Sequence, residues 1–138
     1  MKRIVLISCV SKKLNRPAPA KELYVSTLFR SALRYAMQLR PDAIFVLSAK
    51  YGLVPIEQKI APYNLTLNSM PAAQRRAWAE RVAGDLRTRA DLAKDQFIFL
   101  AGANYRRHLI PSMSHFHVPM SGLGIGKQLQ FLKNQTGL

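Results

Sequence analysis

The stretch "RIVLIS", residues 3–8, sets the fold that this sequence predicts. It is a short, continuous apolar run rich in β-branched residues, and such runs are typical of parallel strands that are buried on both faces. "AIFVLS" at residues 43–48 and "QFIFLAG" at residues 96–102 have the same character. A fourth run, "FHVPM" at residues 116–120, contains Pro119, which favours a position at the edge of the sheet.

Helical patterns separate these strands. Residues 21–39 carry apolar side chains at helical spacing and stop before Pro41, and a second helix is predicted from about Pro71 to Ala90. A short helix follows the third strand, and a last one follows the glycine-rich stretch "GLGIGK". This alternation predicts an α/β fold: a three-layer sandwich in which helices cover both faces of a mostly parallel sheet of four or slightly more strands.

The length and hydrophobicity of the chain predict a single domain. Of its 138 residues 49% are hydrophobic, so residues 1–138 are expected to form one globular domain with an ordinary core. None of the apolar runs approaches the roughly 20 residues that cross a bilayer. The N-terminal run is broken by "SKK" before it reaches the roughly 7–15 residues of a secretory signal peptide. We therefore expect a cytoplasmic protein, whereas the sequence sets no oligomeric state.

The chain is strongly basic, with 21 Lys and Arg against seven Asp and Glu and a net charge of +14. Such an excess repels itself in the folded state and is typical of proteins that bind polyanions. Nucleic acid is therefore the first expected partner, with DNA ahead of RNA. A generally basic domain, or one that binds acidic protein, is the alternative. No predicted helix combines a basic face with exposed bulky apolar residues, so no membrane partner is expected.

Cys9 is the only cysteine, which excludes an intramolecular disulfide and zinc sites of the CxxC type. His115 and His117 alternate on one side of a predicted strand and do not form a metal site by themselves. We expect neither a metal nor a cofactor. A catalytic role for Cys9 would require a base within reach, and no His or Asp is close to it in the sequence.

Polar and glycine-rich loops follow each predicted strand and begin at Ser8, Ser48, Gly102 and Met120. In an open parallel sheet, ligands bind outside the carboxyl ends of the strands, which lie at one edge. We therefore expect a binding site at this edge. The residues predicted to contact phosphate are Lys12, Lys13, Arg106, Arg107, Gly126 and Lys127. Those predicted to contact a base or nucleotide are Ser8, Cys9, Ser11, Tyr51, Gly52, Tyr63, Asn64, Asn104, Tyr105 and Gly124.

These groups suit such ligands for different reasons. Hydroxyls and lysines hold a phosphate or the edge of a base, and Asn104 with Tyr105 suits hydrogen bonding and stacking. The helix after Gly126 offers free amides and the positive end of its dipole, with Lys127 beside it. "GLGIGK" is not a P-loop, because three residues rather than four separate Gly122 from Gly126. The structural alternatives are a solvated loop, a helix cap at Asn104 and a tight turn.

The stretch "LSAKYGLVPIEQKIAPYNLTL", residues 47–67, leaves hydrophobic periodicity after its first residues. Gly52 suits a left-handed turn after the second strand. Tyr51 and Tyr63 can stack on a base, or one of them can anchor the stretch in the core. Glu57 is the only acid in the strand-end loops. We expect this stretch to form one wall of a pocket.

The same stretch resembles the signature of the YaaA-like group of α/β proteins, in particular its compact bacterial and phage branch. The shared pattern is Leu-Ser, two residues, Tyr-Gly-Leu, a Pro with an acid nearby, and Pro-Tyr. "ISCVSKK", "FLAGANYRRHL" and "GLGIGKQLQFL" extend the resemblance over most of the chain. The resemblance implies nucleic-acid binding and an α/β core distantly like that of uracil-DNA glycosylases and of deazaguanine enzymes. The YaaA branch is associated with protection from oxidative stress.

With this resemblance we expect cleavage or exchange of a modified base by an N-glycosidic hydrolase of the DNA-glycosylase type. Glu57 would activate water or stabilise an oxocarbenium-like sugar, and Lys50 is the alternative nucleophile, through a Schiff base. Two rings and two amides would stack on the extruded base and read its edge: Tyr51, Tyr63, Asn64 and Asn104. Two alternatives stay open: a non-enzymatic DNA-binding stress or phage-related protein, and an enzyme acting on a free nucleoside or nucleotide.

The sequence also predicts how these residues lie in space. The strand-end loops should form a single pocket lined by Ser8, Lys50, Tyr51, Glu57, Tyr63, Asn104, Tyr105 and Gly124. Within this pocket, Glu57 should lie in hydrogen-bond reach of Lys50 or of a tyrosine hydroxyl, which would compensate its charge.

Overall fold

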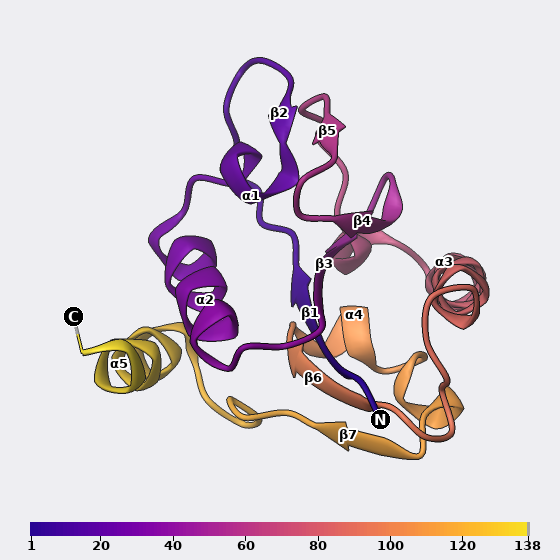
Figure 1. Cartoon of the computed structure of the whole chain (residues 1–138). Coiled ribbons are helices and arrows are strands. Elements are labelled where there is room, and N and C mark those ends of the chain that lie inside the picture. The colour runs from indigo at the N-terminus through magenta and orange to yellow at the C-terminus, as the bar shows by residue number, and fades with distance from the viewer. Residues whose placement is uncertain (138) are drawn as a thin grey trace.

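β1 (Arg3–Ser8) is the central strand of a five-stranded sheet (Figure 1). In the computed structural model, which describes residues 1–137, β1 pairs in parallel with β3 (Ala43–Ser48) on one side and β6 (Gln96–Leu100) on the other. The apolar residues from Ile4 to Ile7 are at most 1% exposed. Burial on both faces is what the continuous apolar run predicts.

Two shorter strands complete the sheet. β4 (Gly52–Pro55) lies antiparallel beside β3, and β7 (His115–His117) lies parallel beside β6, which gives the order β4-β3-β1-β6-β7. The sheet has one strand more than the apolar runs predict, because β4 belongs to the irregular stretch 47–67. All of β7 is exposed, and it is an edge strand, as Pro119 predicts.

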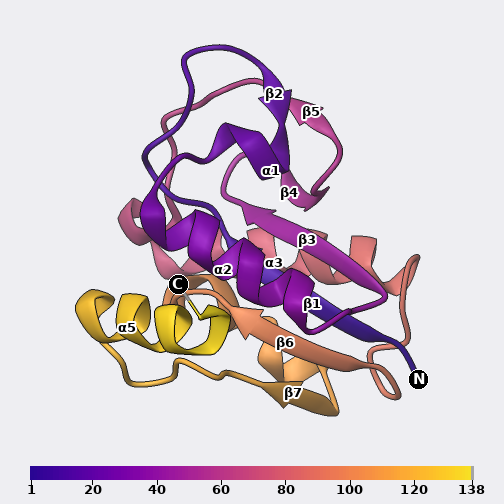
Figure 2. The ribbon, with the colours of Figure 1, turned by 60° about the vertical axis from the view of Figure 1, so that its left-hand side comes forward.

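Helices cover both faces of this sheet. α2 (Thr27–Gln38) packs against α5 (Ile125–Thr136) on one face, and α3 (Ala72–Arg87) lies on the other face with the short α4 (Ala103–Arg106) (Figure 1, Figure 2). The side of α3 that carries Trp78 is buried, as its helical spacing predicts. The fold is therefore the three-layer α/β sandwich that the alternating pattern predicts.

The helix predicted over residues 21–39 is interrupted. α1 (Ala20–Leu23) ends at Tyr24, whose backbone is extended and whose side chain is fully buried. α2 then begins anew, because Ser26 Oγ accepts a hydrogen bond from the Phe29 backbone N–H at 3.1 Å and caps the helix. Burial of the Tyr24 ring and the Ser26 cap together override the helical pattern of this segment.

Smaller elements connect these layers. β2 (Ala18–Pro19) pairs antiparallel with β5 (Lys59–Ile60) above the sheet in the view of Figure 1. Two short 3-10 turns, η1 (Leu67–Ser69) and η2 (Ile110–Ser112), precede α3 and β7. Among residues 1–137, no helix combines the length and the apolar character that crossing a bilayer requires.

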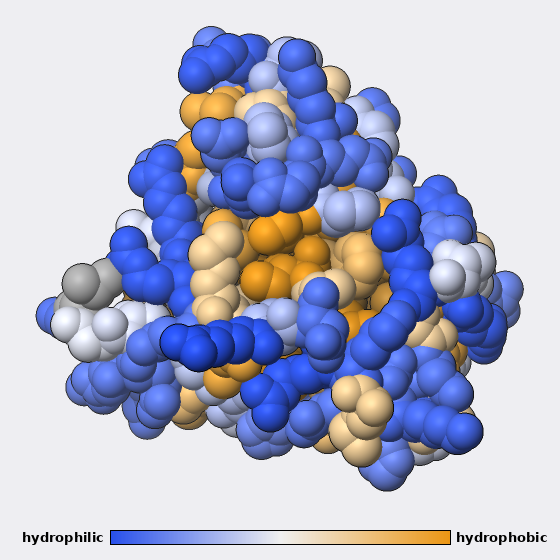
Figure 3. Space-filling view, viewed as in Figure 1, coloured by the Kyte–Doolittle hydropathy of each residue, from blue (hydrophilic) through white to orange (hydrophobic). Residues whose placement is uncertain are grey.

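Figure 3 looks onto the side of the molecule where the N-terminus and the amino ends of the strands lie. Hydrophilic residues cover most of this surface and surround an apolar recess between α2 and β3.

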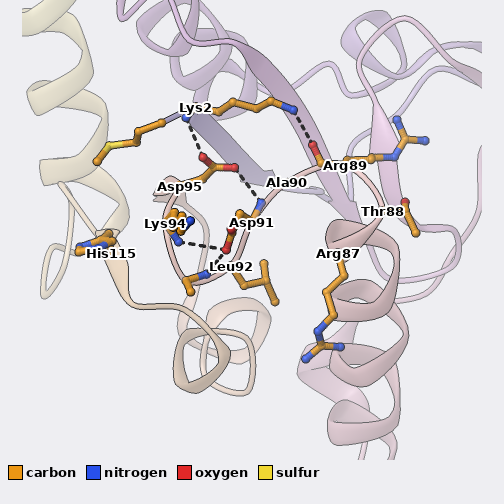
Figure 4. Close-up of a pocket in the computed structure, with 12 residues that line it drawn as sticks. Lys2, Arg87, Thr88, Arg89, Ala90, Asp91, Leu92, Lys94, Asp95 and His115 are labelled. Carbon is orange, nitrogen blue, oxygen red and sulfur yellow. Dashed lines mark hydrogen bonds between the residues drawn. The ribbon is translucent and has the colours of Figure 1, made fainter.

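Carboxylates hold the backbone at this amino edge. Asp95 Oδ1 accepts from the Lys2 backbone N–H at 2.7 Å, and Asp95 Oδ2 accepts from the Asp91 backbone N–H at 2.8 Å (Figure 4). Asp42 Oδ2 accepts from the Arg3 backbone N–H at 2.7 Å in the same way. The N–H groups of Asp91 and Lys2 favour the ionised form, and they hold the pKa of Asp95 below its usual value.

Candidate functional site

A cavity of about 780 Å³ opens at the carboxyl ends of β1 and β6. Its apolar wall comes from the two strand ends and from α2, through Ile7, Phe99 and Phe29. Polar groups surround this wall on the loop after β1, the loop after β6, the loop before η1 and the glycine-rich loop before α5. The volume lies within the range of about 300–1,000 Å³ that is usual for small-molecule sites.

The fold brings several of the predicted site residues together here. Residues from loops that are far apart in the sequence line the cavity: Ser8, Cys9, Ser11, Lys12, Lys13, Asn64, Tyr105 and Arg106. They meet because the parallel strands β1 and β6 end at the same edge of the sheet.

Other predicted residues lie outside the cavity: Lys50, Tyr51, Gly52, Glu57, Tyr63, Asn104, Arg107, Gly124, Gly126 and Lys127. The prediction of one pocket lined by all the strand-end residues is therefore wrong. For Glu57 the reason is topology, because β4 runs antiparallel to β3 and leads the chain away from the carboxyl edge. The Glu57 side chain is 70% exposed, and its Oε1 accepts from Lys21 Nζ at 2.9 Å rather than from Lys50 or a tyrosine.

Ser48 anchors the stretch 47–67 behind the cavity. Its side chain is fully buried, and its Oγ accepts from the Tyr51 backbone N–H at 2.9 Å and donates to the Tyr63 hydroxyl at 2.8 Å. The Tyr63 hydroxyl also shares a hydrogen bond of 2.7 Å with the hydroxyl of Tyr24. Burial raises the pKa of both phenols. Tyr63 is thus held as an anchor of the wall, and its hydroxyl is already used within the protein.

Gly52 and its neighbours form the outer side of this wall. Gly52 has a φ of +75° and starts β4, so the predicted left-handed turn is confirmed. Tyr51 packs edge-on against Tyr63, with ring centroids 5.5 Å apart and planes at 83°. Lys50 is exposed, and its Nζ lies 5.4 Å from the centroid of the Tyr51 ring. The contact that Lys50 makes is therefore with Tyr51 and not with the cavity.

Lys13 lies inside this arrangement. Its Nζ is 4.4 Å from the centroid of the Tyr63 ring and 5.7 Å from that of Tyr24, within the range of cation–π contacts. Removal of the amine from water lowers the pKa of Lys13. The rings of Tyr24 and Tyr63 thus pack against the amine of Lys13, a cavity-lining residue in the loop after β1.

Tyr105 joins the cavity to the core. It is 6% exposed, and its ring packs edge-on against Trp78 at a centroid distance of 5.7 Å. Its hydroxyl accepts from the Leu67 backbone N–H and from Cys9 Sγ, each at 3.3 Å, and lies 3.4 Å from Thr66 Oγ1. Burial raises the pKa of Tyr105 to about 12. Tyr105 therefore presents a protonated hydroxyl beside the buried Cys9 thiol, and its ring is packed in the core.

The loop after β6 is fixed by amide and guanidinium groups. Asn104 Nδ2 donates to Asn68 Oδ1 at 2.8 Å, so Asn104 holds the cavity-lining Asn68 from outside. Arg106 Nη1 donates to the Ala101 carbonyl at 2.6 Å, which places a half-buried cation at the cavity. Arg107 is exposed.

The electrostatic character of the cavity is one-sided. Lys12, Lys13 and Arg106 line it, and no Asp or Glu is among its lining residues. The N-terminal turns of α2 and α5 also reach it, through Ser26 and Ile125. Free amides and the positive dipole end of each helix favour an anion there. The site therefore suits a ligand that carries negative charge beside a flat apolar group.

A family model matches residues 4–134, and the family is described as one of unknown function, DUF6884. The chain belongs to this family. No curated protein and no solved structure matches the chain. The matched range begins in β1 and ends in α5, so every loop that lines the cavity belongs to the DUF6884 domain.

Sequence reasoning missed several polar residues that line the cavity of this DUF6884 domain: Ser26, Thr66, Asn68 and Gln128. Ser26 gave a usable signal, because a serine before an apolar helical pattern is a typical cap. Thr66 and Asn68 gave no local signal. The segment that carries them is held at the cavity by residues distant in the sequence: the Leu67 backbone N–H donates to the Tyr105 hydroxyl, and Asn68 Oδ1 accepts from Asn104 Nδ2.

A second hollow of about 1150 Å³ lies at the amino edge, around the loop that joins α3 to β6 (Figure 4). Asp91 and Asp95 line it, and their carboxylate oxygens accept hydrogen bonds from the backbone of the same region. These acids stabilise the loop and, unlike the carboxyl-edge cavity, place carboxylates beside the basic residues Lys2, Arg87, Arg89 and Lys94 that also line this hollow. Within residues 1–137, no three His, Cys, Asp or Glu side chains are grouped closely enough to hold a metal ion.

Proposed function

We propose that this chain is a nucleic-acid-binding domain, with DNA ahead of RNA, and that its carboxyl-edge cavity receives a nucleobase with its neighbouring phosphate. One observation carries the proposal: an apolar wall stands beside Lys12, Lys13 and Arg106, and no acidic residue lines the cavity. Bases pack on apolar and aromatic surfaces, and cations contact the phosphates next to them. The net charge of +14 attracts a polyanion to the domain.

Excision or exchange of a modified base, which the YaaA-like resemblance implies, is a second possibility for the same site. Enzymes of this kind extrude the base into a closed pocket and contact its edge there. Glu57 and Lys50 are not part of this proposal, because both lie outside the cavity. Cys9, Tyr105 and Asn64 are among the groups within it that can hydrogen-bond to a base.

Oligonucleotide binding at increasing salt tests the proposal. Affinity should fall by orders of magnitude between about 50 and 200 mM salt, because each phosphate contact releases counterions. Lys12→Glu should weaken binding, while Lys94→Glu, the same change of charge at the amino edge, should have a much smaller effect. Binding that is absent or insensitive to salt, or equal losses in the two variants, would contradict the proposal.

The same assay separates the alternatives. Mononucleotides that bind as tightly as oligonucleotides would favour an enzyme acting on free nucleotides, since additional phosphates would then contribute nothing. Tight binding of oligonucleotides without release of any base would favour a non-enzymatic DNA-binding protein.

A further inference from the structure

We propose that Lys13 is the reactive amine of the cavity and forms a Schiff base with an aldehyde on nucleic acid, the ring-opened deoxyribose of an abasic site. This inference rests on the proposed function, because nucleic acid must first bind at the cavity. It assigns covalent chemistry to a residue that the sequence alone marks only as a phosphate contact.

The position of the Lys13 amine is the first support. Lys13 lines the cavity, and its Nζ lies against the faces of Tyr63 and Tyr24 at 4.4 and 5.7 Å from the ring centroids. Its hydrogen bond to the Ser11 carbonyl is long, at 3.4 Å. The two rings thus limit where the amine of this cavity-lining residue can go.

The surroundings of Lys13 are the second support. In residues 1–137 the one salt bridge joins Lys21 to Glu57, so no carboxylate holds Lys13 as an ammonium ion. Desolvation lowers the pKa of Lys13 and outweighs the opposite effect of the nearby Cys9, which increases the fraction of neutral amine. The hydroxyls of Tyr63 and Tyr24 are bonded to each other, and that of Tyr63 also to Ser48, so they do not hold the amine. Nucleophilic lysines depend on such desolvation.

Other lysines near the edge lack this combination. Lys12 lines the cavity but is exposed. Lys50 is exposed, lies outside the cavity and contacts Tyr51. Lys13 is therefore the lysine that is both partly buried and inside the site.

The chemistry balances without a further reagent. The lone pair of the neutral Lys13 amine adds to C1′ of the open-chain aldehyde, and the carbonyl π electrons move to the oxygen, which takes up a proton. The carbinolamine then loses water and leaves an imine between Nζ and C1′. Phosphates on both sides of an abasic sugar would bind Lys12 and Arg106, and the missing base leaves room for the amine to approach.

Reductive trapping tests this inference. The full chain is mixed with a DNA oligonucleotide containing one abasic site, sodium borohydride reduces any imine to a stable amine, and the protein–DNA adduct is mapped by mass spectrometry. Lys13→Arg keeps the positive charge but offers no neutral amine, so the trapped fraction should fall by about tenfold or more. Lys13→Gln is a second variant, and Lys50→Ala is the control that removes a lysine outside the cavity and should trap like the unmodified chain.

Binding is measured separately with an oligonucleotide that carries a tetrahydrofuran site, which lacks the aldehyde. An adduct on Lys13 that disappears in both Lys13 variants and persists in Lys50→Ala supports the inference. Binding of the tetrahydrofuran oligonucleotide with no adduct, or an adduct on Lys50, overturns the inference and leaves the proposed function intact. Absence of binding overturns both.

Discussion

The hydroxyl of Ser48 is fully buried and serves two partners at once, the Tyr51 backbone N–H and the Tyr63 hydroxyl. Ser48→Ala leaves both groups buried without this partner, and we expect a loss of about 1–3 kcal/mol in the free energy of unfolding. Urea denaturation measures it. Ser112→Ala, at an exposed position, is the control and should change stability little. Equal losses in the two variants would show that the Ser48 hydroxyl contributes nothing specific.

The buried phenols predict instability at high pH. Burial raises the pKa of Tyr105 to about 12 and also raises those of Tyr24 and Tyr63. An unfolded tyrosine titrates near pH 10, so the stability that these protonated phenols contribute is complete below about pH 10 and is lost as the pH rises towards 12. Melting temperatures measured from pH 8 upwards should fall in this window. The melting temperature of Tyr105→Phe should fall less over the same pH range. A pH dependence equal to that of the unmodified chain would contradict the role assigned to the buried Tyr105 phenol.

Single residues also show how far the sequence predicts the site. Cys9, Lys13, Tyr105 and Arg106 follow directly from strand ends, and all four line the cavity. Tyr63 was predicted to contact a base but does not line the cavity, because its hydroxyl is bound by Ser48 and Tyr24. These partners are distant in the sequence and give no local pattern. Scarcity of acids made Glu57 stand out, yet its ion pair with Lys21 is an exposed surface contact.

At the scale of elements, β4 depends on the turn at Gly52. Its φ of +75° is unfavourable for other residues, and a Cβ there would lie 3.3 Å from Arg81 Nε. Gly52→Ala should therefore destabilise the protein by about 1–2 kcal/mol. Gly84→Ala is the matched change within α3, where a Cβ meets nothing within 4 Å, and it should stabilise by about 1 kcal/mol. Thermal unfolding measures both, and shifts of the same sign would contradict the role assigned to the Gly52 turn.

Elements with a strong local pattern could be predicted, whereas those made by distant contacts could not. β1 and β3 have the bounds that their apolar runs predict, because burial on both faces leaves an uninterrupted signal. β4 was not predicted, because the sequence of this short edge strand, Gly-Leu-Val-Pro, is also typical of a loop. The break between α1 and α2 was not predicted either. Its cause is the packing of the Tyr24 side chain against Tyr63, a contact between residues distant in the sequence.

Across the whole molecule, the acidic residues are kept away from the cavity. Asp42, Asp91 and Asp95 hold the backbone at the amino edge, and Glu57, between β4 and β5, is paired with Lys21 of α1. The carboxyl edge carries Lys12, Lys13 and Arg106 without an acid among the lining residues. This separation leaves a cationic cavity without acidic lining residues at the place where an open α/β sheet binds its ligands.

An NMR titration tests most directly the proposal that nucleic acid binds at the carboxyl-edge cavity. Backbone amide chemical shifts are measured as a short single-stranded DNA oligonucleotide is added. We expect the largest shifts in residues that line the cavity or begin the adjoining helices: Cys9, Lys13, Thr66, Tyr105 and Gly126. The amides of Lys2 and Lys94 at the amino edge should barely move. Shifts centred on the amino edge, with Cys9 and Tyr105 unchanged, would contradict the assignment of the cavity as the nucleic-acid site.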